Sequence, residues 1–520
     1  MKRIAAIVIN SVSHDTRVLK EADSLASVGY EVEIFGIQDA RCSAPLTTRQ
    51  SGVRIHLCNW KPAGHVLVSR IILAVGTIVV LAAVVMHLTL RHSIHAFITS
   101  RAFVESASVL WVVLLAAVFL LAYWRQRSIA RRISSERSNE PAPNGRPTTA
   151  IGRLWAFKSL AVSKLKGAVM RWSIKRQIVS ELQRFAPDAV HCHDLNALPA
   201  GYAYKKRAGC ILVFDSHELY EEQSLASPWQ KRIYRRWQRY FSGKVDAFIT
   251  INDSIARHLC ERYPRLPRPI IIKNATLPPN RIVNDDGRLH KAAGFKPDQK
   301  ILLYQGGFAV HRGLDSLVRS AVLLPQDWVL VMMGWGRFEP ELKAIAKSID
   351  PAGRRIRFIA GAPQRELAEW TAGAALGVIP YENVCLNHWY CTPNKLWEYP
   401  VAGVPILASP FPEMKQTLIR HDVGRLLTDP VTPQNIAAAV AAISNEQLQR
   451  MRLNCRRYIE QDNWSIYEAR LVGLYRRLFG DADIEVLIVE GGAAAPIKAA
   501  AIAEAKDTGA AASDLQALRW

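Results

Sequence analysis

Short apolar runs alternate with amphipathic stretches along most of the chain. Runs of six to eight residues rich in Val, Ile, Leu and Phe are typical of strands covered on both faces of a parallel sheet. The first series is IAAIVIN, EVEIFGI, VRIHLCNW, AVHCHD, ILVFDS, AFITIN and PIIIKNA. The second is ILLYQGG, WVLVMMG, IRFIAG, ALGVIP, VPILAS and GRLLTD. Because helical patterns separate the strands, the chain is predicted to be α/β, with two doubly wound, Rossmann-like domains facing a cleft.

Two much longer apolar stretches interrupt the first series. Residues 71–90 and 106–124 contain no Asp, Glu, Lys or Arg, and each matches the roughly 20 residues that a membrane-spanning helix needs. A pair of buried core helices is the alternative, but Trp111, Tyr123 and Trp124 lie where interfacial aromatics are expected. The pattern therefore predicts a two-helix transmembrane hairpin within residues 66–124, inserted in the N-terminal domain.

Positive charge is concentrated just after this hairpin. The chain carries a net +22, and residues 125–184 hold 14 basic and three acidic residues. No zinc-finger or RNA-binding signature accompanies them, so anionic lipids are the expected partner and no nucleic acid is expected. Five arginines follow the second span and two lie between the spans, which places both flanking portions in the cytoplasm. We expect a multi-pass protein of the cell inner membrane with its catalytic domains on the cytoplasmic side.

A second basic stretch and the cysteines say little more about partners or compartment. KRIYRRWQR (231–239) either attracts anionic lipid or is a solvated helix face, and the sequence supports both interpretations equally. The eight cysteines show no CxxC spacing, which favours a reducing compartment over a disulfide framework.

The expected domain boundaries follow from these patterns. The N-terminal domain spans 1–275, with a basic and polar linker at 125–150, and the C-terminal domain spans 276–463. A terminal helix at 464–480 is expected to pack back on the N-terminal domain, and the Ala-rich tail 484–520 is expected to be weakly structured.

Polar residues follow several strands of the first domain, at the sheet edge where ligands bind in such folds. GxGxxG and GxxxxGK[ST] are absent, which argues against nicotinamide or flavin enzymes and phosphate-loop ATPases. Asp15 follows the first strand, where it could contact a substrate, but it would serve equally well as a plain helix cap. The two histidines of HCH lie on one face of a strand, but no partner ligand set is evident, so we predict no metal and no cofactor. The candidate site residues of this domain are His14, Asp15, Arg17, His193, Asp194 and Glu218, with His217 beside them.

The second domain offers glycine turns, cations and one carboxylate. Gly306 and Gly307 end a predicted strand and Arg312 follows them, an arrangement that suits a phosphate, although a tight turn alone would also account for the glycines. In TPNKLWEY, Thr392 is expected to cap a short helix, so that the amides of Asn394 and Lys395 face an anion and Glu398 lies one turn inside. These groups predict a site for a diphosphate and for two neighbouring hydroxyls, as in a ribose.

Taken in order, the motifs of both domains resemble those of retaining GT-B glycosyltransferases of glycosyltransferase family 4. The motifs that carry the resemblance are DTRVLKEADSLASVGYEVEIFG, VHCHDLNALPAG, FDSHELYEE, YQGGFAVHRGLDSL, PNKLWEYPVAGVPILAS and NWSIYEARLVGLY. The resemblance implies a nucleotide-sugar donor held by the second domain and an acceptor held by the first. Transfer would need no metal, because electrostatic stabilisation of the leaving diphosphate is the main requirement.

The resemblance also implies roles for individual residues. Glu398 would hold the ribose, Arg312 and Lys395 the diphosphate, and His217 would face the transferred sugar. The donor-binding set is then Gly306, Gly307, Arg312, Asn394, Lys395 and Glu398, with His217 and Glu398 as the catalytic pair. This chain departs from the family in carrying Tyr390 where many members have a second glutamate, and Pro400 within the expected helix.

Three hypotheses remain for the chain. The first is a glycosyltransferase that extends a lipid-linked glycan for a cell-surface polysaccharide. The second is a non-catalytic membrane-anchored GT-B scaffold, which would account for Tyr390. The third is a metal-dependent GT-A enzyme, whose DxD would be Asp481-Ala482-Asp483, far from every candidate site.

Overall fold

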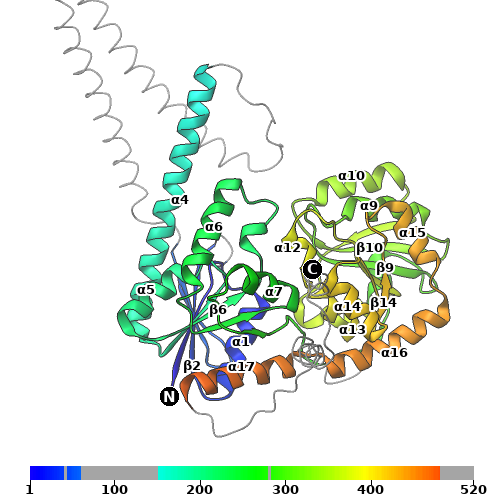
Figure 1. Cartoon of the computed structure of the whole chain (residues 1–520). Coiled ribbons are helices and arrows are strands. Elements are labelled where there is room, and N and C mark those ends of the chain that lie inside the picture. Colours follow the sequence, from blue (N-terminus) through cyan, green and yellow to red (C-terminus); the bar gives the residue numbers. More distant parts are fainter. Residues whose placement is uncertain (14, 40–41, 43, 60–149, 279–282, 481–520) are drawn as a thin grey trace, which may run out of the picture. The chain divides into compact units, whose positions relative to one another are not determined.

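The computed structural model describes residues 1–13, 15–39, 42, 44–59, 150–278 and 283–480 (Figure 1). Contacts divide the chain into two compact units. The first unit comprises residues 1–250, 255–269 and 385–387, and the second comprises 251–254 and 270–384 and continues from 388. The predicted cleft between the two units stays a prediction.

The first unit is built on a largely parallel sheet. Its strands in the described residues are β1 (Arg3–Ile7), β2 (Glu31–Ile37), β3 (Leu46–Thr48), β4 (Arg54–Cys58), β5 (Ala189–His193), β6 (Ile211–Ser216), β7 (Ala247–Thr250) and β8 (Pro269–Ile271). Their order is β3-β4-β2-β1-β5-β6-β7-β8. Every strand predicted in this half of the chain forms. The exposed three-residue edge strand β3, antiparallel to β4, was not predicted because it has no buried apolar face.

Helices connect these strands. They are α1 (Thr16–Ser27), α4 (Ala150–Phe185), α5 (Leu198–Ala208), α6 (Pro228–Phe241) and α7 (Asp253–Arg262), with a single 3-10 turn, η1 (Tyr220–Glu222). The sequence accounts for their ends. Ser227 and Gln230 form a capping box at the start of α6, and Gly209 adopts a left-handed conformation after α5.

The second unit holds a six-stranded parallel sheet of order β11-β10-β9-β12-β13-β14. Its strands are β9 (Lys300–Gly307), β10 (Trp328–Trp335), β11 (Ile356–Ile359), β12 (Leu376–Ile379), β13 (Ile406–Ala408) and β14 (Gly424–Leu426). All six were predicted from their apolar runs. Their side chains form a buried core that includes Leu302, Trp328 and Met332.

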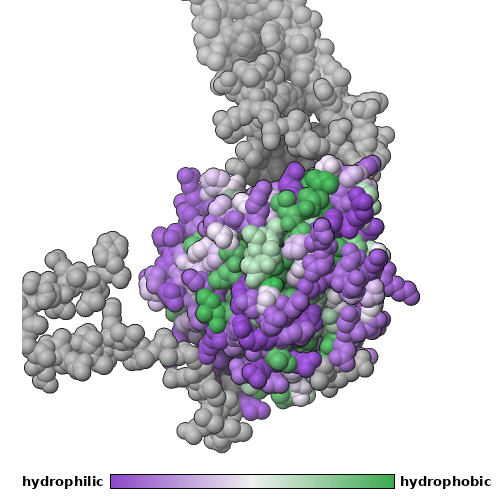
Figure 2. All heavy atoms as spheres, turned by 90° about the vertical axis from the view of Figure 1, so that its right-hand side faces the viewer, coloured by the Kyte–Doolittle hydropathy of each residue, from purple (hydrophilic) through white to green (hydrophobic). Residues whose placement is uncertain are grey.

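The helices of this unit begin with α8 (Arg288–Ala293), α9 (Leu314–Ser320), α10 (Glu339–Ile349), α11 (Leu367–Thr371), α12 (Leu386–Trp389) and α13 (Lys395–Val401). They continue with α14 (Pro412–His421), α15 (Pro433–Ala441), α16 (Asn445–Gln461) and α17 (Trp464–Phe479), and two 3-10 turns, η2 (Ala321–Leu323) and η3 (Gln364–Glu366), complete them. Figure 2 shows hydrophilic residues surrounding smaller hydrophobic patches, as is usual for a folded domain.

Several predicted features of the domain organisation lie in segments that the structure does not describe. The hairpin within 66–124, nearly all of the linker 125–150 and the tail 484–520 lie outside the described residues. Among the residues that are described, no helix combines the length and apolarity needed to cross a membrane. Helix α17 is grouped with the second unit, where the Trp464 amide donates to the Thr276 carbonyl at 2.8 Å, and its predicted packing on the first domain stays a prediction.

Candidate active site

The glycines at the ends of β9 and β10 bring two backbones into contact. Gly306 has φ +116, a conformation that side-chain-bearing residues rarely adopt, and it pairs with Gly334 of β10. A Cβ at Gly334 would lie only 1.9 Å from the Gly306 carbonyl oxygen. At this glycine pair the two strands therefore meet through backbone alone, with no side chain between them, and the next residue of β10 is Trp335.

Two cations lie beside this glycine pair. The Lys395 side chain is buried, with Nζ 5.2 Å from the Tyr304 ring centroid and 3.5 Å from the Tyr381 hydroxyl. Its Nζ would also lie 3.1 Å from a Cβ at Gly306. The Arg312 guanidinium lies over the Tyr381 ring at 5.4 Å. The structure thus brings together the two predicted diphosphate-binding cations, around Tyr381 and next to Gly306.

No carboxylate in the described part of the chain forms an ion pair with Lys395 or Arg312. The Lys395 ammonium lies beside the Tyr304 and Tyr381 rings and the Arg312 guanidinium lies over the Tyr381 ring, contacts that stabilise a cation but do not neutralise it. Taking a charge out of water without an opposite charge is costly, and such residues mark functional sites. An anionic ligand would supply the missing negative charge.

Glu398 lies on α13 and is held by a second polar residue. The buried Gln305 donates through Nε2 to Glu398 Oε2 at 3.2 Å, while its Oε1 accepts from the Thr371 hydroxyl at 2.7 Å. These two hydrogen bonds hold the Glu398 carboxylate beside Gln305, near the end of β9. Glu398 is only partly buried and retains acceptor capacity for ligand hydroxyls. Gln305 and Thr371 were not singled out from the sequence, because nothing in the pattern separates Gln305 from other strand residues.

The start of α13 differs from the prediction. The helix begins at Lys395, Asn394 occupies the cap position without a side-chain cap bond, and the Thr392 hydroxyl accepts from Asn252 Nδ2 at 2.7 Å. The expectation that Thr392 caps this helix was therefore wrong. Its hydroxyl instead accepts a hydrogen bond from Asn252, which is distant in the sequence. The helix is seven residues long and Pro400 lies in its last turn, so its dipole contributes less than the side-chain charges.

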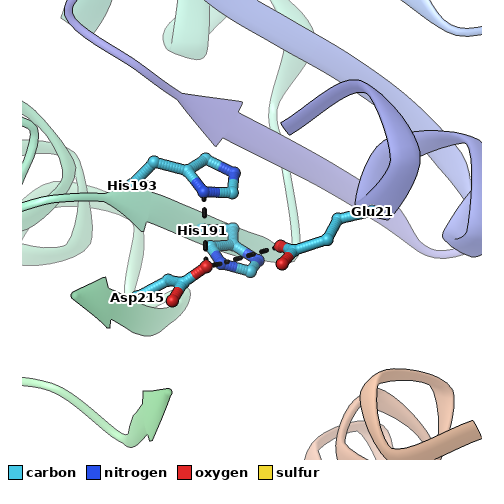
Figure 3. A group of neighbouring side chains, drawn as sticks. All are labelled: Glu21, His191, His193 and Asp215. Carbon is cyan, nitrogen blue, oxygen red and sulfur yellow. Dashed lines mark ion pairs between the residues drawn. The ribbon is translucent and has the colours of Figure 1, made fainter. Parts of the chain in front are cut away.

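In the first unit the candidate residues meet at the carboxyl ends of β5 and β6, around the fully buried Asp215 (Figure 3). The Arg17 guanidinium donates to Asp215 through Nε at 3.0 Å and through Nη2 at 2.9 and 3.0 Å. Glu21, one helical turn after Arg17, lies 3.0 Å from the same guanidinium. His217 Nε2 lies 2.9 Å from Asp215 Oδ2.

His217 and His193 differ in protonation state. Burial alone would lower the pKa of His217, but the Asp215 and Asp194 carboxylates outweigh it and raise the pKa to about 9. Burial lowers the pKa of His193 to about 3, with the neighbouring His191 acting in the same direction. His217 is thus an imidazolium at neutral pH, whereas His193 is neutral. His217 suits donation of a hydrogen bond better than removal of a proton.

Two carboxyl groups flank these histidines. The Arg17 and His217 charges hold the pKa of Asp215 well below its usual range despite burial. Burial raises the pKa of Asp194 to about 6 although His217 opposes the shift. Asp194 has φ +67, which Asp tolerates better than most residues, and its Oδ1 accepts from the His217 amide at 3.0 Å. Asp194 therefore positions the segment that carries His217.

The remaining acceptor-side candidates are placed as follows. His14 lies outside the described residues. Asp15 caps α1, since its Oδ1 accepts from the Val18 amide at 3.3 Å. The alternative interpretation of Asp15 as a helix cap is therefore confirmed. Glu218 accepts from Gln223 Nε2 at 2.6 Å and does not join the Asp215 cluster. Glu21 and His191 do join it. His191 was considered only as a possible metal ligand beside His193, and Glu21 was missed, although the i,i+4 spacing of Arg17 and Glu21 was an available signal.

Glu21, His191, His193 and Asp215 are the group in the described residues that could hold a metal ion, with ligand atoms within 4.8 Å of one another (Figure 3). Two features oppose this. Arg17 already binds both oxygens of Asp215. The His191 and His193 rings are stacked at 4.3 Å with planes 13° apart, so their lone pairs lie in two nearly parallel planes, which does not favour ligation of one ion by both rings. The geometry fits a buried charge network better than a metal centre, and the absence of a metal stays a prediction.

The pKa of His217 predicts how stability depends on pH. Because the folded pKa lies above the ordinary value of 6.5, protonated His217 stabilises the fold fully below about pH 6.5, and this stabilisation is lost as pH rises through about 9. Urea unfolding between pH 6 and 10 should show wild-type stability falling in that window, and a much flatter curve for His217→Gln. His258→Gln, at an unrelated site in the same unit, should keep the wild-type slope. Equal slopes for wild type and His217→Gln would contradict the assigned charge.

Two regions of the chain match known glycosyltransferase domains. The profile for Glycosyltransferase Family 4 matches residues 113–275, and the profile for Glycosyl transferases group 1 matches residues 299–446. A D-inositol 3-phosphate glycosyltransferase of Thermobispora bispora is 24% identical over 315 residues, which cover 55% of this chain and 70% of that protein.

Solved structures share the architecture. Sucrose-phosphate synthase from Thermosynechococcus elongatus matches with a TM-score of 0.64 at 14% identity, covering 93% of this chain and 100% of that one. HepE of Anabaena in complex with UDP-glucose matches with a TM-score of 0.57 at 10% identity, covering 92% and 100%. The two matched regions and the shared two-domain fold support a glycosyltransferase of GT-B fold, in which residues 113–275 match a family 4 domain and residues 299–446 match a group 1 domain.

Proposed function

We propose that this glycosyltransferase moves a sugar, with retention, from a nucleotide-sugar donor to a lipid-linked glycan in the synthesis of a cell-surface polysaccharide. One observation carries the donor part of the proposal: the buried Lys395 and the neighbouring Arg312 have no carboxylate partner in the described residues, and they flank a glycine backbone. A nucleoside diphosphate provides the negative charge that this arrangement lacks. The UDP-glucose bound by HepE, which has the same fold, supports the same assignment.

Each residue then has a chemical task. Lys395 and Arg312 stabilise the negative charge that develops on the diphosphate as the sugar departs. Glu398, fixed by Gln305, accepts hydrogen bonds from the two ribose hydroxyls. The leaving phosphate helps to deprotonate the attacking acceptor hydroxyl, which is the front-face route to retention. No metal takes part, because the two cations supply the stabilisation.

His217 acts on the acceptor side of this scheme. As an imidazolium held by Asp215 and Asp194, it donates a hydrogen bond to an oxygen of the transferred sugar. His193 is neutral and lies 3.4 Å from His217, so it supports the position of that ring.

The membrane part of the proposal rests on the sequence. The stretches 71–90 and 106–124 form a hairpin in the inner membrane and keep the catalytic domains on the cytoplasmic side. Anchoring the acceptor-side domain at the bilayer raises the local concentration of a lipid-linked acceptor. The basic stretches 125–184 and 231–239 add attraction to anionic lipids.

The donor assignment is tested with Glu398→Gln. This change keeps the shape of the side chain and removes its charge, so kcat/KM for the nucleotide-sugar should fall by about 10 to 100-fold, as expected for the loss of one or two hydrogen bonds to a charged group. A panel of UDP- and GDP-sugars assayed with membranes that contain the full chain identifies the donor. Glu341→Gln, on the exposed surface of α10, is the control and should leave transfer unchanged.

Binding of the same UDP- and GDP-sugars distinguishes a glycosyltransferase from the scaffold alternative, which Tyr390 suggested. In the structure the Tyr390 carbonyl accepts from Asn252 Nδ2 at 2.7 Å, so this position serves the fold through its backbone. If calorimetry detects no binding of any UDP- or GDP-sugar by the wild-type protein, the scaffold hypothesis is favoured. Undiminished transfer by Glu398→Gln would instead reject only the ribose assignment.

A further inference from the structure

A groove on the first unit is lined by positive and aromatic side chains and lies apart from the Asp215 cluster. It consists of two adjoining cavities of ≈ 500 and ≈ 670 Å³ along α4, α5 and the end of α6. The two cavities share Lys175, Ala203 and Arg207. Helices α4 and α5 pack against each other there, beside α6 (Figure 1). We call this feature the α4–α5 groove.

The charge of the groove is entirely positive. Lys175, Arg176, Lys206 and Arg207 line it, and no Asp or Glu does. Within the described residues none of these four forms an ion pair. The acids of neighbouring segments are already engaged, since Asp246 pairs with Lys205 at 2.6 Å and Glu181 pairs with Arg184 at 2.6 Å. Four unneutralised cations around one concave surface are suited to a phosphate-bearing ligand.

Aromatic rings form the other part of the lining. Tyr202, Tyr240 and Phe241 contact one another, with ring centroids 5.1 to 5.8 Å apart. At the opposite end, the Trp172 side chain is 57% exposed and its ring lies 4.7 Å from the Arg176 guanidinium. Amphipathic rings next to Lys and Arg are typical of protein surfaces at the headgroup level of a bilayer.

The groove is separate from the proposed reaction site. Lys206 and Arg207 are in the last turn of α5, immediately before β6 begins at Ile211, whereas Asp215 is near the end of that strand. The strand therefore separates the two sites along its length. The groove also lies on α4, and the apolar stretch 106–124 precedes that helix by only 25 residues in the sequence. A membrane-embedded hairpin would hold α4 close to lipid headgroups.

We propose that the α4–α5 groove binds the headgroup of an anionic phospholipid. The phosphate is held by Lys175, Lys206 and Arg207, and the glycerol and upper acyl carbons lie against Tyr202, Tyr240 and Phe241. The bound lipid fixes the depth and orientation of the first unit on the membrane. This inference rests on the membrane part of the proposed function and is independent of the transfer reaction.

The groove is tested by lipid binding alone, without donor or acceptor. The full-length protein in neutral detergent is titrated with phosphatidylglycerol carrying a fluorescent acyl chain, and anisotropy reports binding. The triple variant Lys175→Gln/Lys206→Gln/Arg207→Gln should bind at least about tenfold more weakly, because each Lys or Arg near an anionic surface contributes severalfold to affinity. Unlabelled dihexanoyl-phosphatidylglycerol should displace the probe, and the phosphatidylcholine analogue should not.

A matched variant separates the groove from general charge. Arg257→Gln/Arg265→Gln/Arg268→Gln removes the same number of charges from exposed positions of the same unit, and should change affinity by less than about twofold. Equal weakening in both triple variants, or wild-type affinity in the groove variant, would overturn the proposal. Displacement by inorganic phosphate at the same concentration as lipid would show a phosphate site and reject the lipid. If the triple variant does not fold, Arg207→Gln, which borders both cavities, gives the same test.

The outcome does not depend on the sugar chemistry. Failure of the groove variant to lose lipid affinity leaves the donor assignment standing. Conversely, loss of transfer in Glu398→Gln with normal lipid binding leaves the groove standing.

Discussion

Replacement of Lys395 by Met should reduce the rate of sugar transfer by about 10³-fold, with a parallel loss of affinity for the nucleoside diphosphate. Met keeps much of the length of the side chain but removes the ammonium group. That group is buried between Tyr304 and Tyr381 beside the Gly306 backbone, where a developing phosphate charge is stabilised more strongly than in water. Removal of one such preorganised group from an active site commonly costs about 10²- to 10³-fold.

The stability of the same variant gives a second expectation. Met keeps the packing of this buried side chain, and the ammonium forms no ion pair with a carboxylate in the described residues, so Lys395→Met should unfold at about the same temperature as wild type. Lys343→Met, on α10, removes an ammonium that pairs with Glu339 at 2.7 Å near the surface, and should leave transfer unchanged. Wild-type transfer by Lys395→Met would reject its diphosphate role. A fall in both activity and unfolding temperature would make Lys395 a structural residue.

The strands could be predicted well because a parallel sheet buries both faces of each strand. Strands such as β6 and β10 therefore appear in the sequence as continuous apolar runs, and the Gly-rich or polar turns that bound them mark their ends. The edge strand β3 has three exposed residues and carries no such signal. Its formation depends on β4 lying alongside, which is a tertiary effect.

The two halves of the candidate site differed in how far the sequence predicted them. In the second unit, glycines and cations occur in compact motifs, and Gly306, Arg312, Lys395 and Glu398 meet as expected. In the first unit, the cluster around Asp215 assembles residues from positions 17 to 217, and no local pattern predicts that Glu21 turns inward. Thr392 was misassigned for a similar reason, because its partner Asn252 is 140 residues away.

The second large effect is expected at Arg17, whose guanidinium contacts the buried Glu21 and Asp215 and, together with the His217 imidazolium, compensates the charge of Asp215. Arg17, Glu21 and Asp215 are each at most 3% exposed. Arg17→Met should lower the free energy of unfolding by about 3 to 5 kcal/mol, since loss of one partner leaves buried charge uncompensated. Urea unfolding at pH 7 measures this loss. Arg49→Met, which breaks the half-exposed pair with Asp23, is the control and should cost less than about 1 kcal/mol.

The pH dependence of this loss distinguishes lost charge compensation from lost packing. In wild type the pKa of Asp215 is depressed, so its ionised form stabilises the fold above the unfolded pKa of about 4, and that stabilisation disappears as pH falls through the folded pKa. Without Arg17 this pKa rises, and Asp215 takes up a proton as the pH is lowered. The difference between wild type and Arg17→Met should therefore shrink from pH 7 to pH 4. Adding Asp215→Asn to Arg17→Met should recover part of the stability at pH 7, because the uncompensated carboxylate is gone. A loss that is constant with pH and is not relieved by Asp215→Asn would mean that Arg17 stabilises the fold through packing of its side chain, and not through its charge.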